Sequence, residues 1–167
     1  MNVNIILIGL MGAGKTTVGK NLANVLDDYV FIDTDEAIER KENRKISEIF
    51  KEQSEDYFRQ IETNTIRELV KTQNQIISIG GGGFEKEENR QLLLNSGKVF
   101  YLQADIDILY NRIKDDSTRP LLYCNNPKEK LEELLHKREK NYKKAHFIIN
   151  TENKSMKEII KEIIKEL

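Results

Sequence analysis

The sequence of 167 residues contains a single cysteine, two prolines, no tryptophan and no excess of basic residues. One cysteine cannot form a disulfide within the chain, which fits a reducing compartment such as the cytoplasm. A formal net charge of −1, with both signs interspersed, argues against a nucleic-acid-binding domain, which usually carries a basic excess or stripe. No apolar run approaches the roughly 20 residues that a membrane-spanning helix needs. We therefore expect a cytoplasmic protein that binds neither nucleic acid nor membranes and that is, from its size alone, a monomer.

Nothing in the chain resembles a linker or a repeat, and its length suits a single domain over residues 1–167. Short runs rich in Val, Ile and Phe predict buried strands at residues 3–8, 29–33, 75–79, 98–102 and 146–150. Amphipathic stretches predict helices at 15–27, 56–72, 105–113, 127–144 and from 155 onward. Strands that alternate with helices predict an α/β fold with a parallel sheet and right-handed crossovers.

Three unusual segments each follow one of the first three predicted strands. GLMGAGKTT follows the first strand, DTD ends the second, and four consecutive glycines follow the third. In open parallel sheets, ligands bind beyond the carboxyl ends of the strands. The shared position of the three segments therefore predicts one binding site at that edge of the sheet.

The first of these segments matches the phosphate-loop pattern G-x-x-x-x-G-K-[ST] at residues 9–16. The glycines let backbone N–H groups turn toward a phosphate, and the following helix adds its positive N-terminal end. In this pattern the lysine reaches the β- and γ-phosphates and the hydroxyl binds Mg²⁺. We expect ATP to contact Gly12, Ala13, Gly14, Lys15, Thr16 and Thr17.

Two aspartates one residue apart, in FIDTDE, end the second predicted strand. Asp33 is expected to reach Mg²⁺ as a hard oxygen ligand, directly or through water. Asp35 would then face the acceptor and orient, or deprotonate, its hydroxyl group. The alternative is that Asp35 is only the N-cap of a helix over residues 36–41.

Further candidates lie in the glycine cluster and among the arginines. Backbone N–H groups of Gly80, Gly81 and Gly82 could approach a ligand, although a simple tight turn is the alternative. Arg59 and Glu62 are neighbours on one helix face, where a surface ion pair is the plain interpretation. The same interpretation applies to Arg138, which lies one helical turn before Tyr142.

A polar stretch over residues 114–126 separates two predicted helices and suggests a lid beside the phosphate site. This stretch contains Arg119, and an arginine on a closing lid can stabilise charge on the transferring phosphoryl group. Arg112 lies just before the stretch, near a helix end. It is either a contact for the nucleotide or a solvated surface residue.

Taken together, these residues resemble shikimate kinase. The matching stretches are GLMGAGKTTVG, FIDTD, FRQIE, SIGGGG, RPLL and the pair Arg138 and Tyr142, in matching order and spacing. The resemblance implies a P-loop fold like that of nucleoside monophosphate kinases, with a five-stranded parallel sheet in the order 2-3-1-4-5 and a lid. It implies ATP-dependent phosphorylation of the 3-hydroxyl group of shikimate, a step toward chorismate and the aromatic amino acids.

The resemblance also implies roles for individual residues. Lys15 and Arg119 would attend the γ-phosphate, Thr16 and Asp33 the Mg²⁺, and Arg112 the nucleotide. Asp35 would bind shikimate hydroxyl groups, while Arg59 and Arg138 grip its carboxylate beside the backbone of Gly80, Gly81 and Gly82. Glu62 would hold Arg59 in place, and residues 34–72 would form the acceptor-binding segment.

Two arginines and an aspartate at one site independently suggest a small hydroxylated acid, because guanidinium groups match carboxylates as a fork. Gluconate is also a hydroxy acid, so a gluconate kinase is one alternative. A second alternative is a nucleotide-binding module without catalytic activity, which would not need to retain Asp35, Arg59, Arg119 and Arg138 together.

Overall fold

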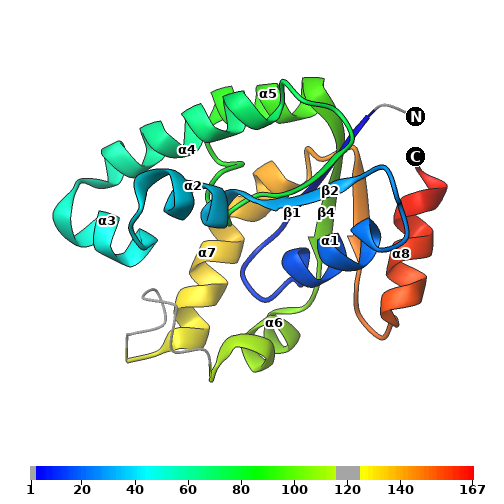
Figure 1. The fold of residues 1–167 in the computed structure, drawn as a ribbon. Helices are drawn as coiled ribbons and strands as arrows, with labels where there is room; N and C mark the ends of the chain where they lie inside the picture. The colour runs from blue at the N-terminus through cyan, green and yellow to red at the C-terminus, as the bar shows by residue number, and fades with distance from the viewer. Residues whose placement is uncertain (1–2, 116–124) are drawn as a thin grey trace.

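The computed structural model describes residues 3–115 and 125–167. Its centre is a parallel sheet with the strand order β2-β3-β1-β4-β5, which confirms the predicted α/β fold and strand order (Figure 1). The strands are β1 (Asn4–Ile8), β2 (Val30–Asp33), β3 (Gln75–Ser78), β4 (Gly97–Gln103) and β5 (Phe147–Asn150). The register pairs Asp33 at the end of β2 with Ser78 at the end of β3. The segments that follow these two strands therefore leave the sheet at the same level.

Eight helices are described over these residues. They are α1 (Lys15–Ala23), α2 (Thr34–Glu42), α3 (Ile46–Glu52), α4 (Glu55–Leu69), α5 (Glu87–Ser96), α6 (Ile106–Ile113), α7 (Pro127–Tyr142) and α8 (Met156–Lys165). None of the described helices is both long and apolar enough to cross a membrane. Residues 116–124, which contain Arg119 and most of the predicted lid, lie outside the described residues.

Helices cover both faces of the sheet. Leu7 of β1 approaches Gly19 of α1, and α1 packs in turn against α8. Tyr101 of β4 pairs with Ile8, so it points to the face opposite Leu7, where its ring lies 5.1 Å from the ring of Tyr142 in α7. The sheet is thus buried between the α1 and α8 layer and a layer that contains α7 (Figure 1). This double coverage explains why all five residues of β1 are buried.

A second, smaller apolar cluster lies away from the sheet. Ile38 of α2, Ile49 of α3, and Phe58 and Ile61 of α4 pack together. The cluster joins the three helices that project to one end of the molecule in Figure 1. The part of the chain between residues 38 and 61 therefore has apolar packing of its own beside the main core.

Most predicted elements lie within a few residues of the observed ones, but two helices were not predicted. These are α3 and α5. In addition, α1 ends at Ala23 instead of residue 27, and α2 begins at Thr34 instead of residue 36. The second difference bears on the site, because it moves the helix N-cap from Asp35 to Asp33.

Candidate active site

The phosphate loop joins β1 to α1 and packs against α6. Gly12 and Gly14 have φ angles of 82° and 86°, which favour glycine. A Cβ atom on Gly12 would lie 2.7 Å from the carbonyl oxygen of Leu109 in α6. Arg112, one turn later in α6, donates a hydrogen bond of 3.1 Å from Nη1 to the Gly12 carbonyl oxygen. Arg112 therefore contacts the phosphate loop. The expected contact of Arg112 with the nucleotide stays a prediction.

Lys15 is the first residue of α1 and folds back over the loop. Its Nζ atom donates hydrogen bonds to the carbonyl oxygens of Gly9 and Leu10, at 2.9 and 3.2 Å. Ala13 is buried and donates its N–H group to Leu10 within the loop. The loop is thus closed on itself, with a cationic group at the N-terminal end of a helix. This arrangement favours the binding of an anion.

Asp33 connects the phosphate loop to the start of α2. Its Oδ2 atom accepts a hydrogen bond of 3.0 Å from the hydroxyl group of Thr16, and its Oδ1 atom accepts one of 3.0 Å from the backbone N–H of Asp35. The second bond makes Asp33 the N-cap of α2. The alternative that Asp35 is merely a helix cap is therefore wrong. Asp35 is instead the second residue of α2, because the strand ends and the helix begins earlier than the sequence suggested.

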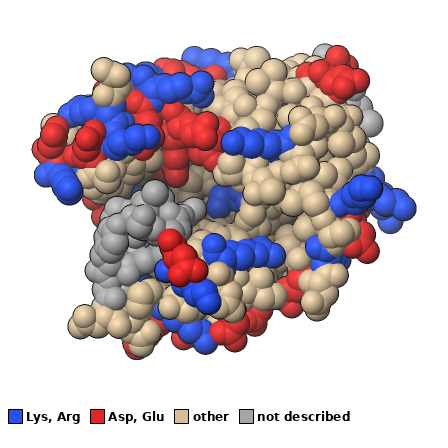
Figure 2. All heavy atoms as spheres, turned by 60° about the horizontal axis from the view of Figure 1, so that its bottom comes forward, with Lys and Arg blue, Asp and Glu red and all other residues tan. Residues whose placement is uncertain are grey.

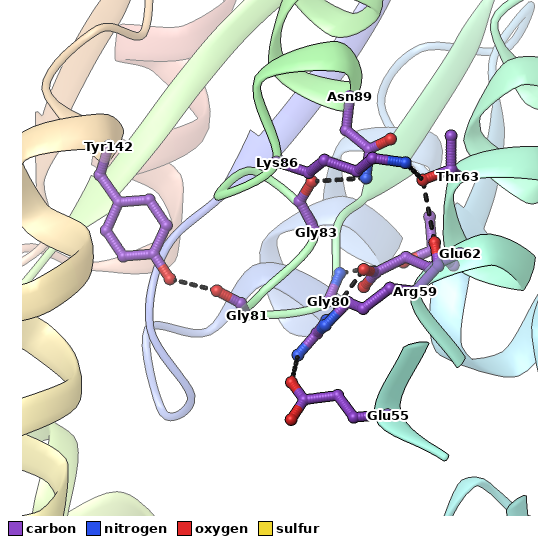
Figure 3. Close-up of polar contacts among 11 residues, drawn as sticks. Glu55, Arg59, Glu62, Thr63, Gly80, Gly81, Gly83, Lys86, Asn89 and Tyr142 are labelled. Carbon is purple, nitrogen blue, oxygen red and sulfur yellow. Dashed lines mark hydrogen bonds and ion pairs between the residues drawn. The ribbon is translucent and has the colours of Figure 1, made fainter. Parts of the chain in front are cut away.

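The glycine turn, residues 80–83 after β3, lies among the acceptor-side candidates, and Figure 3 labels Gly80, Gly81 and Gly83 of this turn. The turn is closed by a hydrogen bond from the N–H of Gly83 to the carbonyl oxygen of Gly80. The Gly80 N–H donates a hydrogen bond to the hydroxyl oxygen of Thr34. Thr34 is the middle residue of the DTD motif, and its side chain is fully buried. Sequence reasoning gave Thr34 no role, although its place in that motif was the available signal.

Each glycine of the turn faces a different functional group. A Cβ atom on Gly80 would lie 2.5 Å from Asp35 Oδ1, and one on Gly81 would lie 3.1 Å from Arg138 Nη1. A Cβ on Gly82 would lie 2.8 Å from Arg59 Nη1, and one on Gly83 would lie 3.1 Å from Glu62 Oε1. The turn therefore brings together the acceptor-side candidates Asp35, Arg59 and Arg138 from three different helices.

Arg59 lies between two carboxylates of its own helix, α4. Its Nη1 atom donates to Glu62 Oε2 at 2.9 Å, and its Nη2 atom donates to Glu55 Oε1 at 3.2 Å. The Glu62 side chain is only 2% exposed, so this is not the surface ion pair of the plain interpretation. Burial raises the pKa of Glu62 above its ordinary value, and the guanidinium groups of Arg59 and Arg138 act in the opposite direction. Sequence reasoning missed Glu55.

Tyr142, at the end of α7, connects this helix to the glycine turn through a hydrogen bond. Its hydroxyl group donates a hydrogen bond of 2.6 Å to the carbonyl oxygen of Gly81. The side chain is buried, and burial raises the pKa of Tyr142 above its ordinary value. Tyr142 therefore stays neutral and acts as a donor, which fixes the turn beside Arg138 one helical turn earlier.

One face of the molecule is hollowed (Figure 2). Basic atoms are visible inside the hollow, and residues of both charges crowd the end of the molecule that carries α2, α3 and α4. Within residues 3–115 and 125–167, no group of three or more His, Cys, Asp or Glu side chains could hold a metal ion.

The fold and the site define a class of protein. A phosphate loop with its lysine, a hydroxyl–carboxylate pair beside it, and an acceptor side with two arginines and an aspartate are features of P-loop kinases that act on small anionic molecules.

Comparisons with known proteins identify the family. The shikimate kinase family profile matches residues 11–167. A shikimate kinase from Thermodesulfovibrio yellowstonii is 43% identical over 163 residues, covering 98% of this chain and 94% of that protein. A structure of shikimate kinase from Acinetobacter baumannii in complex with shikimate is 37% identical, with a TM-score of 0.94, covering 99% of this chain and 93% of that one. The chain belongs to the shikimate kinase family.

For the gluconate kinase alternative, the comparison with solved structures shows only a likeness of fold. A gluconokinase from Sinorhizobium meliloti has a TM-score of 0.64 over 98% of this chain and 90% of its own, at 16% sequence identity. Such a likeness places the two proteins in one fold class and says nothing about a shared acceptor.

Proposed function

We propose that the phosphate loop and the glycine turn together carry out the reaction that gives the family its name. ATP donates its γ-phosphoryl group to the 3-hydroxyl group of shikimate, which yields shikimate 3-phosphate and ADP. The observation that carries the proposal is the chain of hydrogen bonds from Thr16 to Asp33 and from Asp33 to the start of α2, where Thr34 accepts a further hydrogen bond from Gly80. This link holds the phosphate side and the acceptor side of the site next to each other.

On the nucleotide side, the N–H groups of residues 12–17 and the Lys15 ammonium group would bind the β- and γ-phosphates. Arg112, which already contacts the loop, would lie beside the nucleotide. The donor set fits Mg²⁺, because the Thr16 hydroxyl and the Asp33 carboxylate are hard oxygens 3.0 Å apart. When bound, Mg²⁺ would neutralise charge that develops on the phosphate oxygens.

On the acceptor side, Arg59 and Arg138 would bind the carboxylate of shikimate across the glycine turn, with Gly80, Gly81 and Gly82 leaving room for it. Asp35 would accept a hydrogen bond from the 3-hydroxyl group and orient its oxygen toward the γ-phosphorus. As the new O–P bond forms, the bond to the bridging oxygen of ADP breaks. The hydroxyl proton then passes to Asp35 or to solvent.

The remaining expectations are part of the same proposal. The chain would act as one domain in which residues 34–72 bind the acceptor, a division that the separate apolar cluster of α2, α3 and α4 supports. Residues 114–126 would close as a lid and bring Arg119 to the γ-phosphate, which excludes water from the reaction. A monomeric, cytoplasmic protein without nucleic-acid or membrane partners stays a prediction.

A coupled assay of ADP release tests the proposal, with ATP, Mg²⁺ and either shikimate, gluconate or no acceptor. We expect turnover with shikimate alone, and a loss of several orders of magnitude in kcat for Asp35→Asn and Lys15→Ala. Asp28→Asn, at an exposed turn, is the matched control and should keep full activity. Turnover with gluconate and not shikimate would reassign the acceptor. ATP binding without any acceptor-dependent turnover would refute a kinase function.

A further inference from the structure

Both terminal nitrogens of Arg59 are engaged by carboxylates of its own helix (Figure 3). These are the nitrogens with which a guanidinium group holds a carboxylate ligand in bidentate fashion. An acid that binds Arg59 through them must therefore share or replace one of the two protein carboxylates, Glu55 and Glu62.

The two carboxylates differ in how readily they can be replaced. Glu62 is 2% exposed, and its Oε1 atom lies beside Gly83 of the turn, so it has no room to withdraw. Glu55 is 69% exposed and is the first residue of α4. Its pair with Arg59 has i,i+4 helical spacing, and exposed pairs of this kind contribute little stability. A carboxylate that arrives from solvent would displace Glu55 and leave Glu62 in place.

We propose that Glu55 tunes acceptor affinity by occupying, in the absence of acceptor, the position on Arg59 Nη2 that the acceptor's carboxylate takes. Glu55 is a positioning residue that acts through Arg59 and opposes binding, whereas Glu62 orients the same guanidinium group and supports binding. The inference rests on the proposed function, in which Arg59 binds the carboxylate of shikimate. The opposite role, in which Glu55 merely helps to orient Arg59, predicts an effect of opposite sign.

The expected effect follows from two contributions. Breaking an exposed helical ion pair corresponds to roughly a twofold change in an equilibrium constant. A like charge that remains about 5 Å from the bound carboxylate in water-like surroundings corresponds to roughly a fourfold change. Glu55→Gln should therefore lower the KM for shikimate about two- to eightfold, the upper value applying if both contributions act in full. It should leave kcat and the KM for ATP unchanged.

Two further variants separate the contact from the charge. Glu55→Asp keeps a negative charge at the first position of α4, where it favours the helix, but its side chain is too short for the contact of 3.2 Å. It should lower the KM for shikimate by a smaller factor than Glu55→Gln. Glu68→Gln is the matched control, since Glu68 lies on the same helix, is similarly exposed and pairs with Lys41 away from the site. It should leave every kinetic constant unchanged.

Steady-state kinetics of the four proteins, with shikimate varied at saturating ATP, decide the matter. The dissociation constant of shikimate, measured by calorimetry without nucleotide, should fall in parallel with KM. An unchanged or raised KM in Glu55→Gln, or an equal fall in Glu68→Gln, would overturn the inference. Failure of the proposed function looks different, because the wild-type protein would then show no shikimate-dependent release of ADP.

Discussion

Replacing Gly82 by alanine should weaken acceptor binding while the protein stays folded. The backbone at Gly82 is not in the left-handed region, so alanine can adopt it without strain. The atoms that a new Cβ would meet belong to the far end of Arg59, a long and flexible side chain. The substitution therefore acts on the position of one guanidinium group and not on the fold.

The magnitude follows from the contact distances. The new Cβ would lie 2.8 Å from Arg59 Nη1, and ordinary van der Waals contact begins near 3.4 Å. The guanidinium group must therefore move by about 0.6 Å. Glu62 is buried and cannot follow, so its hydrogen bond of 2.9 Å to Arg59 lengthens toward the limit of such bonds. Losing about 1.4 kcal/mol of a charge-assisted interaction raises the KM for shikimate about tenfold.

Stability should change less, because opposing effects act on it. The weakened pair of Arg59 and Glu62 destabilises the folded state, while alanine in place of glycine restricts the unfolded chain and stabilises the protein by about 0.4–1 kcal/mol. We expect a Tm within a few degrees of wild type and a kcat close to it. The measurements are thermal unfolding and steady-state kinetics with shikimate varied.

Gly80→Ala provides the contrast. Its new Cβ would lie 2.5 Å from Asp35 Oδ1, whereas the new Cβ of Gly82→Ala meets an arginine. This variant should lower kcat at least tenfold, with a smaller effect on KM, since in the proposed mechanism Asp35 acts on the reacting hydroxyl group. If Gly82→Ala and Gly80→Ala changed kcat and KM in the same proportions, the assignment of different partners to the two glycines would be wrong. A normal KM in folded Gly82→Ala would refute the role of Arg59.

Three further predictions concern neighbouring parts of the site. Because the pKa of Glu62 is raised in the folded protein, the stability that this group contributes is greatest below its ordinary pKa of 4.5 and is lost as pH rises through its folded pKa. Glu62→Gln should therefore gain Tm relative to wild type over that rise, and a constant difference across pH would contradict the raised pKa. Thr16→Val removes one of the two proposed metal ligands and should increase the Mg²⁺ concentration required for half-maximal activity at least tenfold; an unchanged Mg²⁺ dependence would exclude Thr16 as a ligand. Arg112→Ala should raise the KM for ATP severalfold and leave the KM for shikimate unaltered, which kinetics with each substrate varied in turn would check.

The sheet and its order could be predicted because several constraints agree. Buried strands, a phosphate loop and helical periodicity all indicate a parallel sheet, and the resemblance supplies the order. The helices α3 and α5 escaped prediction for a local reason. The first is only seven residues long, and the apolar residues of the second, LLL, are consecutive instead of spaced by three or four. Short or unevenly patterned helices depend on tertiary packing for their definition.

The identity of the cap of α2 shows a different limit of sequence reasoning. Two aspartates separated by one residue can each accept the N–H hydrogen bond that begins a helix, and the sequence alone does not say which one does. The pairing of Asp33 with Ser78 settles the question, because β2 ends where its partner strand ends. That pairing joins residues far apart in the chain. Glu55 was missed because a glutamate in the first turn of a charged helix is usually a solvated surface residue, and the sequence does not show what it contacts.

The arrangement around the glycine turn explains why the sequence could predict the functional groups near the turn but not which glycine each group faces. Strand β3 lies between β2 and β1, so the turn that follows it comes between Asp33 to Asp35 and the phosphate loop. Side chains from α2, α4 and α7 reach this point from different directions, and four glycines leave space for all of them. A side chain at any one of these positions would displace a different functional group. The turn therefore lies at the centre of the proposed acceptor site. Because its residues have no side chains, adding a methyl group at each position tests one neighbouring functional group at a time.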